Sequence, residues 1–352
     1  KIDQGELVGV IGPNGSGKST LLKLMAGILY PDQGLVDFMD RNIGSIKRRE
    51  LAQTLSWIPQ ENHLTFPFQG MEVVLMGRHP YLGPMSFEKK KDISVAEWAM
   101  DLTNTRQFSS RLFTEISGGE KQRVAFGRAV LSMPELLVMD EPLAALDAGH
   151  KGEILPFIER LRDEIGIPII YVSHALEEVI RLADNLVILD QGSTVASGGL
   201  ENMMSRLDLR PLMGRHESGA VMGVVVCGHD KTFGLTELSF TGGRLLVPGL
   251  ELPLGTSLRM RIRARDVSLS LSKPSDTSIL NVLPATVKEI APSSGPQTEI
   301  LLDIGVPLIA RVTRRSLEIM ALHPGKNVFA LIKAAAVDRH SLGLVSTGQA
   351  HN

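Results

Sequence analysis

Cysteine is almost absent from this sequence, since Cys227 is the only one among 352 residues. A disulfide or a cysteine-based metal site within one chain is therefore excluded, which suits a reducing compartment. Cys227 follows the apolar residues 224–226, so we expect it to be a small buried side chain.

Long apolar runs and an excess of one charge are also missing. No run approaches the ~20 apolar residues of a membrane-spanning helix, and the start lacks the charged-then-apolar layout of a signal peptide. The net charge of -2 gives no electrostatic sign of nucleic-acid binding, so no such partner is expected. The chain begins at Lys1 instead of Met, few residues before the first predicted strand, and we expect that its natural N-terminal segment is missing.

The remaining composition is that of a globular protein, with 43% hydrophobic and 22% charged residues. A chain of 352 residues exceeds the size at which one core usually keeps growing, so at least two domains are expected.

The clearest motif is a glycine-rich segment that fits the phosphate-loop pattern. It consists of Gly12, Pro13, Asn14, Gly15, Ser16, Gly17, Lys18, Ser19 and Thr20. The apolar run 7–11 predicts a buried strand before it, and leucines at helical spacing predict a helix after it. Such a loop turns backbone N–H groups toward phosphate oxygens. Lys18 would reach the β- and γ-phosphates of ATP, and the Ser19 hydroxyl would bind Mg²⁺.

Two later strands end in residues that complete a phosphate-hydrolysing site. The apolar run 136–139 leads into Asp140 and Glu141, and the run 169–172 leads to Ser173 and His174. Asp140 is placed to hold Mg²⁺ directly or through water, and Glu141 is the candidate general base. The alternative, in which the acidic pair caps the next helix, is disfavoured by the phosphate loop upstream.

A second anion-binding element lies at residues 116–124, where Ser117, Gly118 and Gly119 precede Glu120 and open a predicted helix. A helix start offers free N–H groups and the positive end of its dipole.

Strands and helices alternate up to about residue 206 and predict a largely parallel sheet covered on both faces. From residue 219 onward, strand-like segments separated by short turns predict small β-barrels. The two halves of this region, before and after Pro274–Asp276, are candidates for two related barrels. The run of lysines at 89–91 is most simply a solvated helix face.

These motifs together resemble the ATP-binding subunit of ABC transporters over residues 1 to about 205. The resemblance rests on Walker A at 12–20, Gln60 after a strand, Ser-Gly-Gly at 117–119, Walker B at 136–141, Asp147 and His174, in that order. Position 120 is Glu where the family more often has Gln, and Ile116 stands where Leu is commoner. The aromatic residue that stacks on adenine in the family lies upstream of Walker A, and residues 1–10 contain no aromatic side chain.

The resemblance implies a role for each matching residue. Gln60 would touch Mg²⁺ and sense the membrane partner, joining Ser19 and Asp140 as metal-site residues. Ser117, Gly118, Gly119 and Glu120 would form the signature that contacts ATP on the opposite protomer. Asp147 would be the D-loop aspartate, and His174 the switch histidine at the γ-phosphate. Catalysis would then rest on Glu141, His174 and Lys18.

The family also implies partners and a location. Two copies would close head to tail around two ATP molecules, and the dimer would bind membrane permease subunits at the cytoplasmic face of the cell membrane. An external substrate-binding protein would be an indirect partner.

The sequence resembles two groups of importers that carry different substrates. The segments 57–60 and 71–81 resemble ATPases for iron-siderophore, haem or cobalamin import, whereas the sequence from Ser117 onward resembles the ATPases of molybdate importers. Residues 263–267, 278–281, 310–316 and 332–334 resemble a molybdate-type TOBE domain, which in relatives binds oxyanions or dimerises. Ser278, Asn281, Thr313 and Ser316 offer suitable donors for an oxyanion, although a role as turn residues is an open alternative.

We therefore predict an α/β P-loop ABC ATPase followed by a β-rich, OB-like TOBE domain. The ATPase domain would span 1–206, with a helical subdomain at about 61–133, and a linker would span 207–218. The TOBE region would cover 219–340, with a tail at 341–352. The predicted function is ATP hydrolysis that powers import of molybdate or a related oxyanion such as tungstate. A soluble ABC ATPase and an oxyanion-binding regulatory protein are the alternatives of another class.

Overall fold

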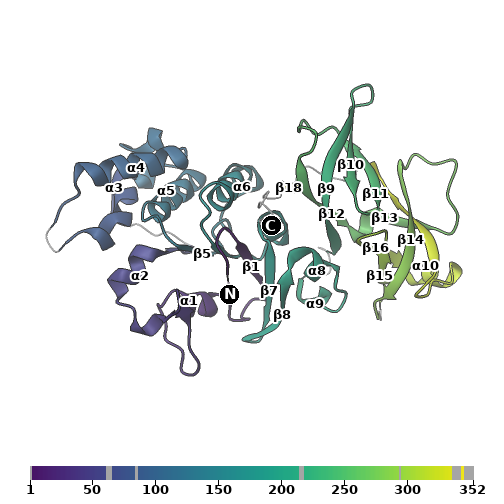
Figure 1. The fold of residues 1–352 in the computed structure, drawn as a ribbon, viewed down its shortest axis with the longest axis horizontal. Coiled ribbons are helices and arrows are strands. Elements are labelled where there is room, and N and C mark those ends of the chain that lie inside the picture. Colours follow the sequence, from purple (N-terminus) through teal and green to yellow (C-terminus); the bar gives the residue numbers. More distant parts are fainter. Residues whose placement is uncertain are drawn as a thin grey trace. The chain divides into compact units, whose positions relative to one another are not determined.

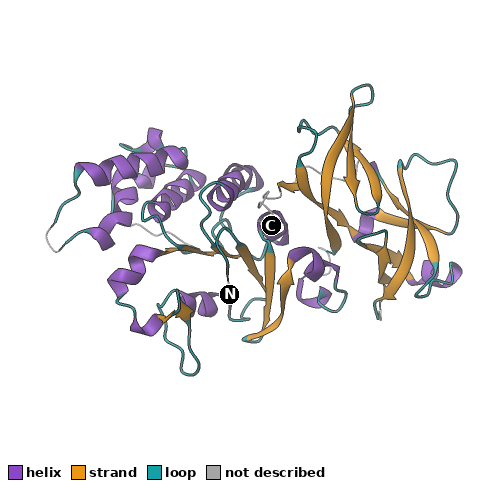
Figure 2. Cartoon of the chain, in the orientation of Figure 1, coloured by secondary structure: helices purple, strands orange, loops and turns teal. Residues whose placement is uncertain are grey.

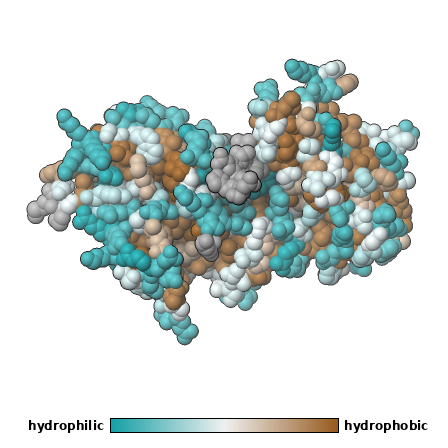
Figure 3. Space-filling view, in the orientation of Figure 1, coloured by the Kyte–Doolittle hydropathy of each residue, from teal (hydrophilic) through white to brown (hydrophobic). Residues whose placement is uncertain are grey.

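A computed structural model describes residues 2–60, 66–83, 86–213, 218–292, 295–334 and 342–344 of the chain. The contacts divide the chain into two compact units, Lys1–Ala196 and Ser197–Asn352. Helices and strands alternate in the first unit, whereas long strands dominate the second (Figures 1 and 2). Hydrophilic residues cover much of the visible surface of the helices of the first unit, with apolar residues in scattered patches (Figure 3).

The first unit is built on a six-stranded sheet with the order β4-β5-β6-β1-β7-β8. Its strands are β1 (Leu7–Ile11), β4 (Leu55–Ile58), β5 (Leu136–Asp140), β6 (Ile169–Val172), β7 (Asn185–Asp190) and β8 (Ser193–Gly199). The pairs β4–β5, β5–β6, β6–β1 and β1–β7 are parallel. The central strands β1, β5 and β6 are buried along their whole length, as expected for a parallel sheet with both faces covered.

Helices on both sides of the strands complete this unit. They are α1 (Lys18–Met25), α2 (Arg48–Thr54), α6 (Ala148–Asp163) and α7 (Leu176–Leu182), with a small hairpin of β2 (Asp37–Phe38) and β3 (Arg41–Asn42). Val10, Leu22 and Val138 share one apolar cluster, which packs α1 against the sheet.

The helices α3 (Gly70–Leu75), α4 (Lys90–Leu102) and α5 (Gly118–Val130) form a separate packing group (Figure 1). Val74, Met100 and Val124, one from each helix, are fully buried in a single cluster. This group lies within the region 61–133 that the sequence predicts to be helical, apart from 61–65 and 84–85, which lie outside the described residues.

The second unit contains two five-stranded sheets. One has the order β11-β10-β9-β12-β18 and the other β13-β17-β14-β15-β16. The strands of the first sheet are β9 (Gly219–Asp230), β10 (Leu235–Phe240), β11 (Gly243–Pro248), β12 (Ser257–Arg263) and β18 (Leu342–Leu344). Those of the second are β13 (Val267–Ser270), β14 (Asn281–Ile290), β15 (Gln297–Asp303), β16 (Pro307–Thr313) and β17 (Asn327–Ile332). Short helices α8 (Leu200–Ser205), α9 (Arg210–Met213) and α10 (Arg314–Ile319) accompany them.

The two sheets share one hydrophobic core, which does not support two separate barrels. Val224 and Met260 of the first sheet and Val287 and Ile300 of the second lie in the same buried cluster. The sheets also separate earlier than the predicted break at 274–276, because β13 already pairs with β17. A 3-10 turn at Ala264–Asp266 separates β12 of the first sheet from β13 of the second.

The expected burial of Cys227 is wrong. Its side chain is exposed, whereas Val224 and Val226 on the same strand are buried. Successive side chains of a strand point to opposite faces, so Cys227 next to the inward-facing Val226 must face outward.

Candidate active site

The predicted site residues follow the carboxyl ends of neighbouring parallel strands. β1 leads into the phosphate loop, β5 ends at Asp140, and β6 is followed by Ser173 and His174. Gln60 is exposed two residues after β4, the next strand of the sheet. Because parallel strands end at the same edge of a sheet, motifs more than 100 residues apart in sequence meet there.

The phosphate loop requires glycine at the positions where the sequence has it. A Cβ at Gly12 would lie 2.1 Å from the Leu189 carbonyl oxygen, so no larger residue fits. Gly17, the N-cap of α1, has φ of 96°, a left-handed conformation that favours glycine. The loop thus passes closely over β7 and enters α1 with its N–H groups free for an anion.

Two polar side chains of the loop are held as a phosphate site would need. Lys18 is 6% exposed, and its Nζ donates to the carbonyl oxygens of Gly12 at 2.9 Å and Pro13 at 3.0 Å. Ser16 is 2% exposed and its buried Oγ has no hydrogen-bond partner. A buried hydroxyl without a partner is costly, and a phosphate oxygen in the loop would supply the missing acceptor.

Two of the predicted metal-site residues, Ser19 and Asp140, are in contact with each other. Ser19 Oγ donates to Asp140 Oδ1 at 3.2 Å across 121 positions of sequence. Burial raises the pKa of the Asp140 carboxyl, and the Ser19 hydrogen bond partly opposes this rise. A hydroxyl and a buried carboxylate side by side are hard oxygen ligands of the kind that Mg²⁺ prefers.

The predicted general base and the predicted switch histidine are also in contact. His174 Nδ1 lies 3.0 Å from Glu141 Oε2, although β5 and β6 deliver these residues from different parts of the sequence. Glu141 has φ of 46°, unusual for a residue other than glycine, and its N–H donates to the Val172 carbonyl. The Glu141 carboxylate thus lies against His174, the second residue after β6.

The start of α5 explains the glutamate at position 120. Ser117 Oγ accepts from the Glu120 N–H at 3.4 Å, and Glu120 Oε2 accepts from the Ser117 N–H at 2.7 Å. This capping box lowers the pKa of Glu120 through the bond from the Ser117 backbone. The pattern Ser-x-x-Glu was readable in the sequence, but its capping role was not predicted.

Asp147 serves as the N-cap of α6. Its Oδ1 accepts from the His150 N–H at 3.0 Å, and its Oδ2 lies 2.8 Å from His150 Nδ1. His150 was not predicted, and its ring also packs on Gly119, where a Cβ would lie 2.7 Å from His150 Cδ2. The predicted signature and D-loop residues are thus in contact through a side chain that no motif marked.

These features fit ATP with Mg²⁺. The loop has the tight glycine geometry of a phosphate cradle, Ser16 lacks an acceptor, and Ser19 and Asp140 form an oxygen pair. The described part of the chain contains no group of three or more His, Cys, Asp or Glu side chains arranged to hold a metal. Mg²⁺ in this site would therefore share its coordination with phosphate oxygens, as it commonly does.

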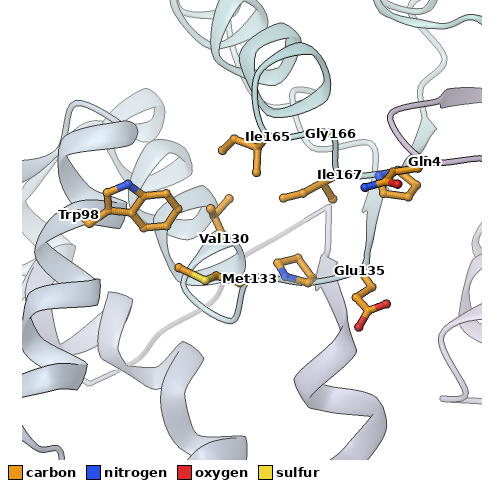
Figure 4. A pocket seen from close by; sticks show the side chains of 10 residues that line it. Gln4, Trp98, Val130, Met133, Glu135, Ile165, Gly166 and Ile167 are labelled. Atoms are coloured by element: carbon orange, nitrogen blue, oxygen red, sulfur yellow. The ribbon is translucent and has the colours of Figure 1, made fainter. Parts of the chain in front are cut away.

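A cleft at the other edge of the same sheet is separate from this site (Figure 4). Trp98, Val130 and Met133 line one side, and Glu135 and residues 165–168 line the other. Since Glu135 directly precedes β5, the cleft lies at the strand starts, whereas the phosphate loop follows a strand end.

Three of the four predicted oxyanion donors of the second unit take part in hydrogen bonds of the fold. Asn281 is 4% exposed, its Oδ1 accepts from the Leu246 N–H at 2.7 Å, and its Nδ2 donates to the Leu246 carbonyl at 2.9 Å. Thr313 caps α10, accepting from the Ser316 N–H at 3.1 Å, and the two hydroxyls are 2.8 Å apart. Ser278 is exposed. Asn281 therefore joins β14 to β11 through both the oxygen and the nitrogen of its buried amide.

Residues 1–144 match the family model of the ABC transporter, and residues 277–338 match that of the TOBE domain. The chain is 42% identical over 345 residues to the molybdenum import ATP-binding protein ModC of Mesorhizobium japonicum, covering 96% of this chain and 91% of the relative. ModC of Paramagnetospirillum magneticum is 40% identical over 343 residues, covering 95% and 92% respectively.

Solved structures give the same family. An inward-facing metal-chelate type ABC transporter is 25% identical with a TM-score of 0.56, covering 71% of this chain and 88% of that one. A dimeric bacterial ABC transporter cassette is 26% identical with a TM-score of 0.51, covering 57% and 88%. These matches and the TOBE match confirm the predicted fold class. None of the described helices is long and apolar enough to cross a membrane.

The phosphate loop meets the Asp140–Glu141 pair and His174 at one sheet edge, and relatives about 40% identical extend over nearly the whole chain. The chain belongs to the ATP-binding subunits of ABC transporters, in the family of the molybdenum import ATP-binding proteins.

Proposed function

We propose that this chain hydrolyses ATP to power the import of molybdate, or a related oxyanion such as tungstate, through a separate membrane permease. The assignment of ATP hydrolysis rests on two contacts beside the phosphate loop, Ser19 with Asp140 and Glu141 with His174. The substrate rests on the molybdenum import proteins that match the chain along both units.

Each side chain has a defined task in this proposal. The loop N–H groups and Lys18 hold the β- and γ-phosphates, and Lys18 exchanges its two carbonyl acceptors for phosphate oxygens. Glu141 accepts the proton of the attacking water, and His174 contacts the γ-phosphate while bonding the Glu141 carboxylate. Ser19, Asp140 and Gln60 would hold Mg²⁺, which supplies positive charge to the phosphates.

The active form in this proposal is a head-to-tail dimer. Ser117, Gly118, Gly119 and Glu120 would face the ATP of the second copy, with Asp147 beside them. Gly118 and Gly119 open α5, and the amides of a helix start attract an anion. The dimeric cassette among the similar structures supports such an arrangement. The dimer would bind its permease at the cytoplasmic face of the membrane and receive substrate indirectly from an external binding protein.

Uptake in a deletion strain tests the substrate. Cells that lack the gene are given radiolabelled molybdate, an iron-siderophore complex or cobalamin, and are complemented with the natural gene or with its Glu141→Gln variant. We expect molybdate uptake to return only with the natural gene. Restoration of iron-siderophore or cobalamin uptake instead would refute the molybdate assignment and leave the ATPase assignment standing.

A further inference from the structure

The carboxylate of Glu178 is a buried hub beside the hydrolysis site. Glu178 lies on α7 and is 5% exposed. Its Oε2 accepts from Tyr171 Oη at 2.7 Å and from Ser173 Oγ at 2.8 Å. Its Oε1 accepts from Lys151 Nζ at 2.7 Å. One side chain therefore joins the end of β6, the loop after it, and α6.

The bonds of Ser173 bracket His174. Ser173 Oγ donates to Glu178 and accepts from the Ala175 N–H at 3.0 Å, so the residues on both sides of His174 are tied to one hydroxyl. Ser173 is 3% exposed, whereas the His174 side chain is 57% exposed. The exposed imidazole thus projects from a loop whose anchor is buried, and its distance to Glu141 depends on that anchor.

The lysine on the other carboxylate oxygen extends the link to the D-loop. Lys151 lies on the first turn of α6, and its N–H donates to the carbonyl of Asp147, the N-cap of that helix, at 3.0 Å. The Glu178 hub therefore connects the residues that carry His174 with the helix that begins at Asp147.

Core stability alone does not require this arrangement. A buried ion pair is often no more stabilising than apolar residues of similar volume, because both charges lose their hydration. Burial raises the pKa of Tyr171 well above its usual value, and the Glu178 charge adds to the rise, so the phenol remains a donor to the carboxylate. The contacts of the hub join β6, the loop that carries His174, and α6.

We propose that Glu178 is a positioning residue for ATP hydrolysis, which holds the Ser173–Ala175 loop so that His174 meets Glu141. The inference rests on the proposed ATPase function. Loss of Glu178 should lower kcat and leave ATP affinity nearly unchanged, because the phosphate loop belongs to another strand. Small misplacements of reacting groups cost up to about 10²-fold, so we expect kcat of Glu178→Gln to fall by roughly 10- to 100-fold.

Glu159 provides a matched control. It is also 5% exposed and joins α6 to α7, through Arg181 at 2.7 and 2.9 Å, but none of its described contacts involves the His174 loop. Glu159→Gln removes a buried carboxylate between the same two helices. General loosening of the helices would lower kcat in both variants, whereas our proposal expects kcat of Glu159→Gln to stay within about twofold of the natural protein.

A double-mutant cycle separates positioning from structure. Steady-state phosphate release and fluorescent-ATP titration are measured on the full chain for Glu178→Gln, His174→Ala and the double variant, below their melting temperatures. If Glu178 acts through His174, the second change lowers kcat by less than about threefold in the His174→Ala background. The proposal would be overturned if Glu178→Gln lowered kcat by the same factor in the natural protein and in His174→Ala, or if it left kcat of the natural protein unchanged.

Ser173→Ala keeps the test decisive if Glu178→Gln fails to fold or if His174→Ala is inactive. It removes one hydrogen bond of the hub and leaves the buried ion pair with Lys151. We expect a loss in kcat with unchanged ATP affinity, and natural kcat in a folded Ser173→Ala protein would refute the positioning role. Hydrolysis by the natural protein together with natural kcat in these variants would overturn only this inference, whereas absence of hydrolysis in the natural protein would overturn the proposed function.

Discussion

Replacing Glu141 by Gln tests the chemistry of the site most directly. The Glu141 carboxylate lies 3.0 Å from His174 Nδ1, and glutamine keeps the shape and one acceptor oxygen for that contact. The variant therefore loses mainly the capacity to accept a proton. A positioned general base contributes roughly 10²- to 10⁴-fold to the rate, equivalent to about 2.7–5.4 kcal/mol of activation free energy.

The assay compares phosphate release and ATP binding in the natural protein and in Glu141→Gln, with the permease present. We expect turnover to fall by the factor above while the ATP dissociation constant stays within a few-fold, because the phosphate loop is untouched. Glu164→Gln is the matched control, since Glu164 is an exposed partner of Arg160 at the end of α6, and such surface pairs contribute only about 0–1 kcal/mol. Turnover of Glu141→Gln close to that of the control would refute its role as the base.

Three further predictions concern stability. Burial raises the pKa of Asp140, so its ionised form destabilises the nucleotide-free fold at neutral pH. Asp140→Asn should therefore raise the melting temperature at pH 7. This gain should disappear as the pH falls to about 4, near the pKa of the carboxyl in the unfolded chain. A gain that persists at pH 3 would contradict the electrostatic cause. Asn281→Ala should lower the free energy of unfolding by about 1–3 kcal/mol, because the Leu246 backbone groups lose their partners, and should leave molybdate binding by the full chain unchanged in calorimetry. Glu120→Gln should keep the capping box and change stability by less than about 1 kcal/mol at pH 7 in urea unfolding, and a loss above 2 kcal/mol would show that the carboxylate charge is essential.

The sequence alone determined the motifs and their supports, because each depends on neighbouring residues. The phosphate loop is local glycine chemistry between an apolar run and a helix, and the structure has β1 and α1 at those positions. The runs before Asp140 and His174 are buried strands for the same local reason. Parallel pairing then follows from the alternation of strands and helices, so the sequence also predicts that these residues share one edge.

Only the tertiary structure decided which side chains meet across elements. Cys227 is exposed because Val226 packs into the core, and this fixes which side chains of β9 point outward. The Asn281 side chain is hydrogen-bonded to Leu246 of β11, 35 residues away in the sequence. Glu178 is an ordinary acidic residue of a short helix in the sequence. Its partners Lys151, Tyr171 and Ser173 come from three other segments, and it becomes a hub because folding removes its carboxylate from water and leaves these donors as its hydrogen-bond partners.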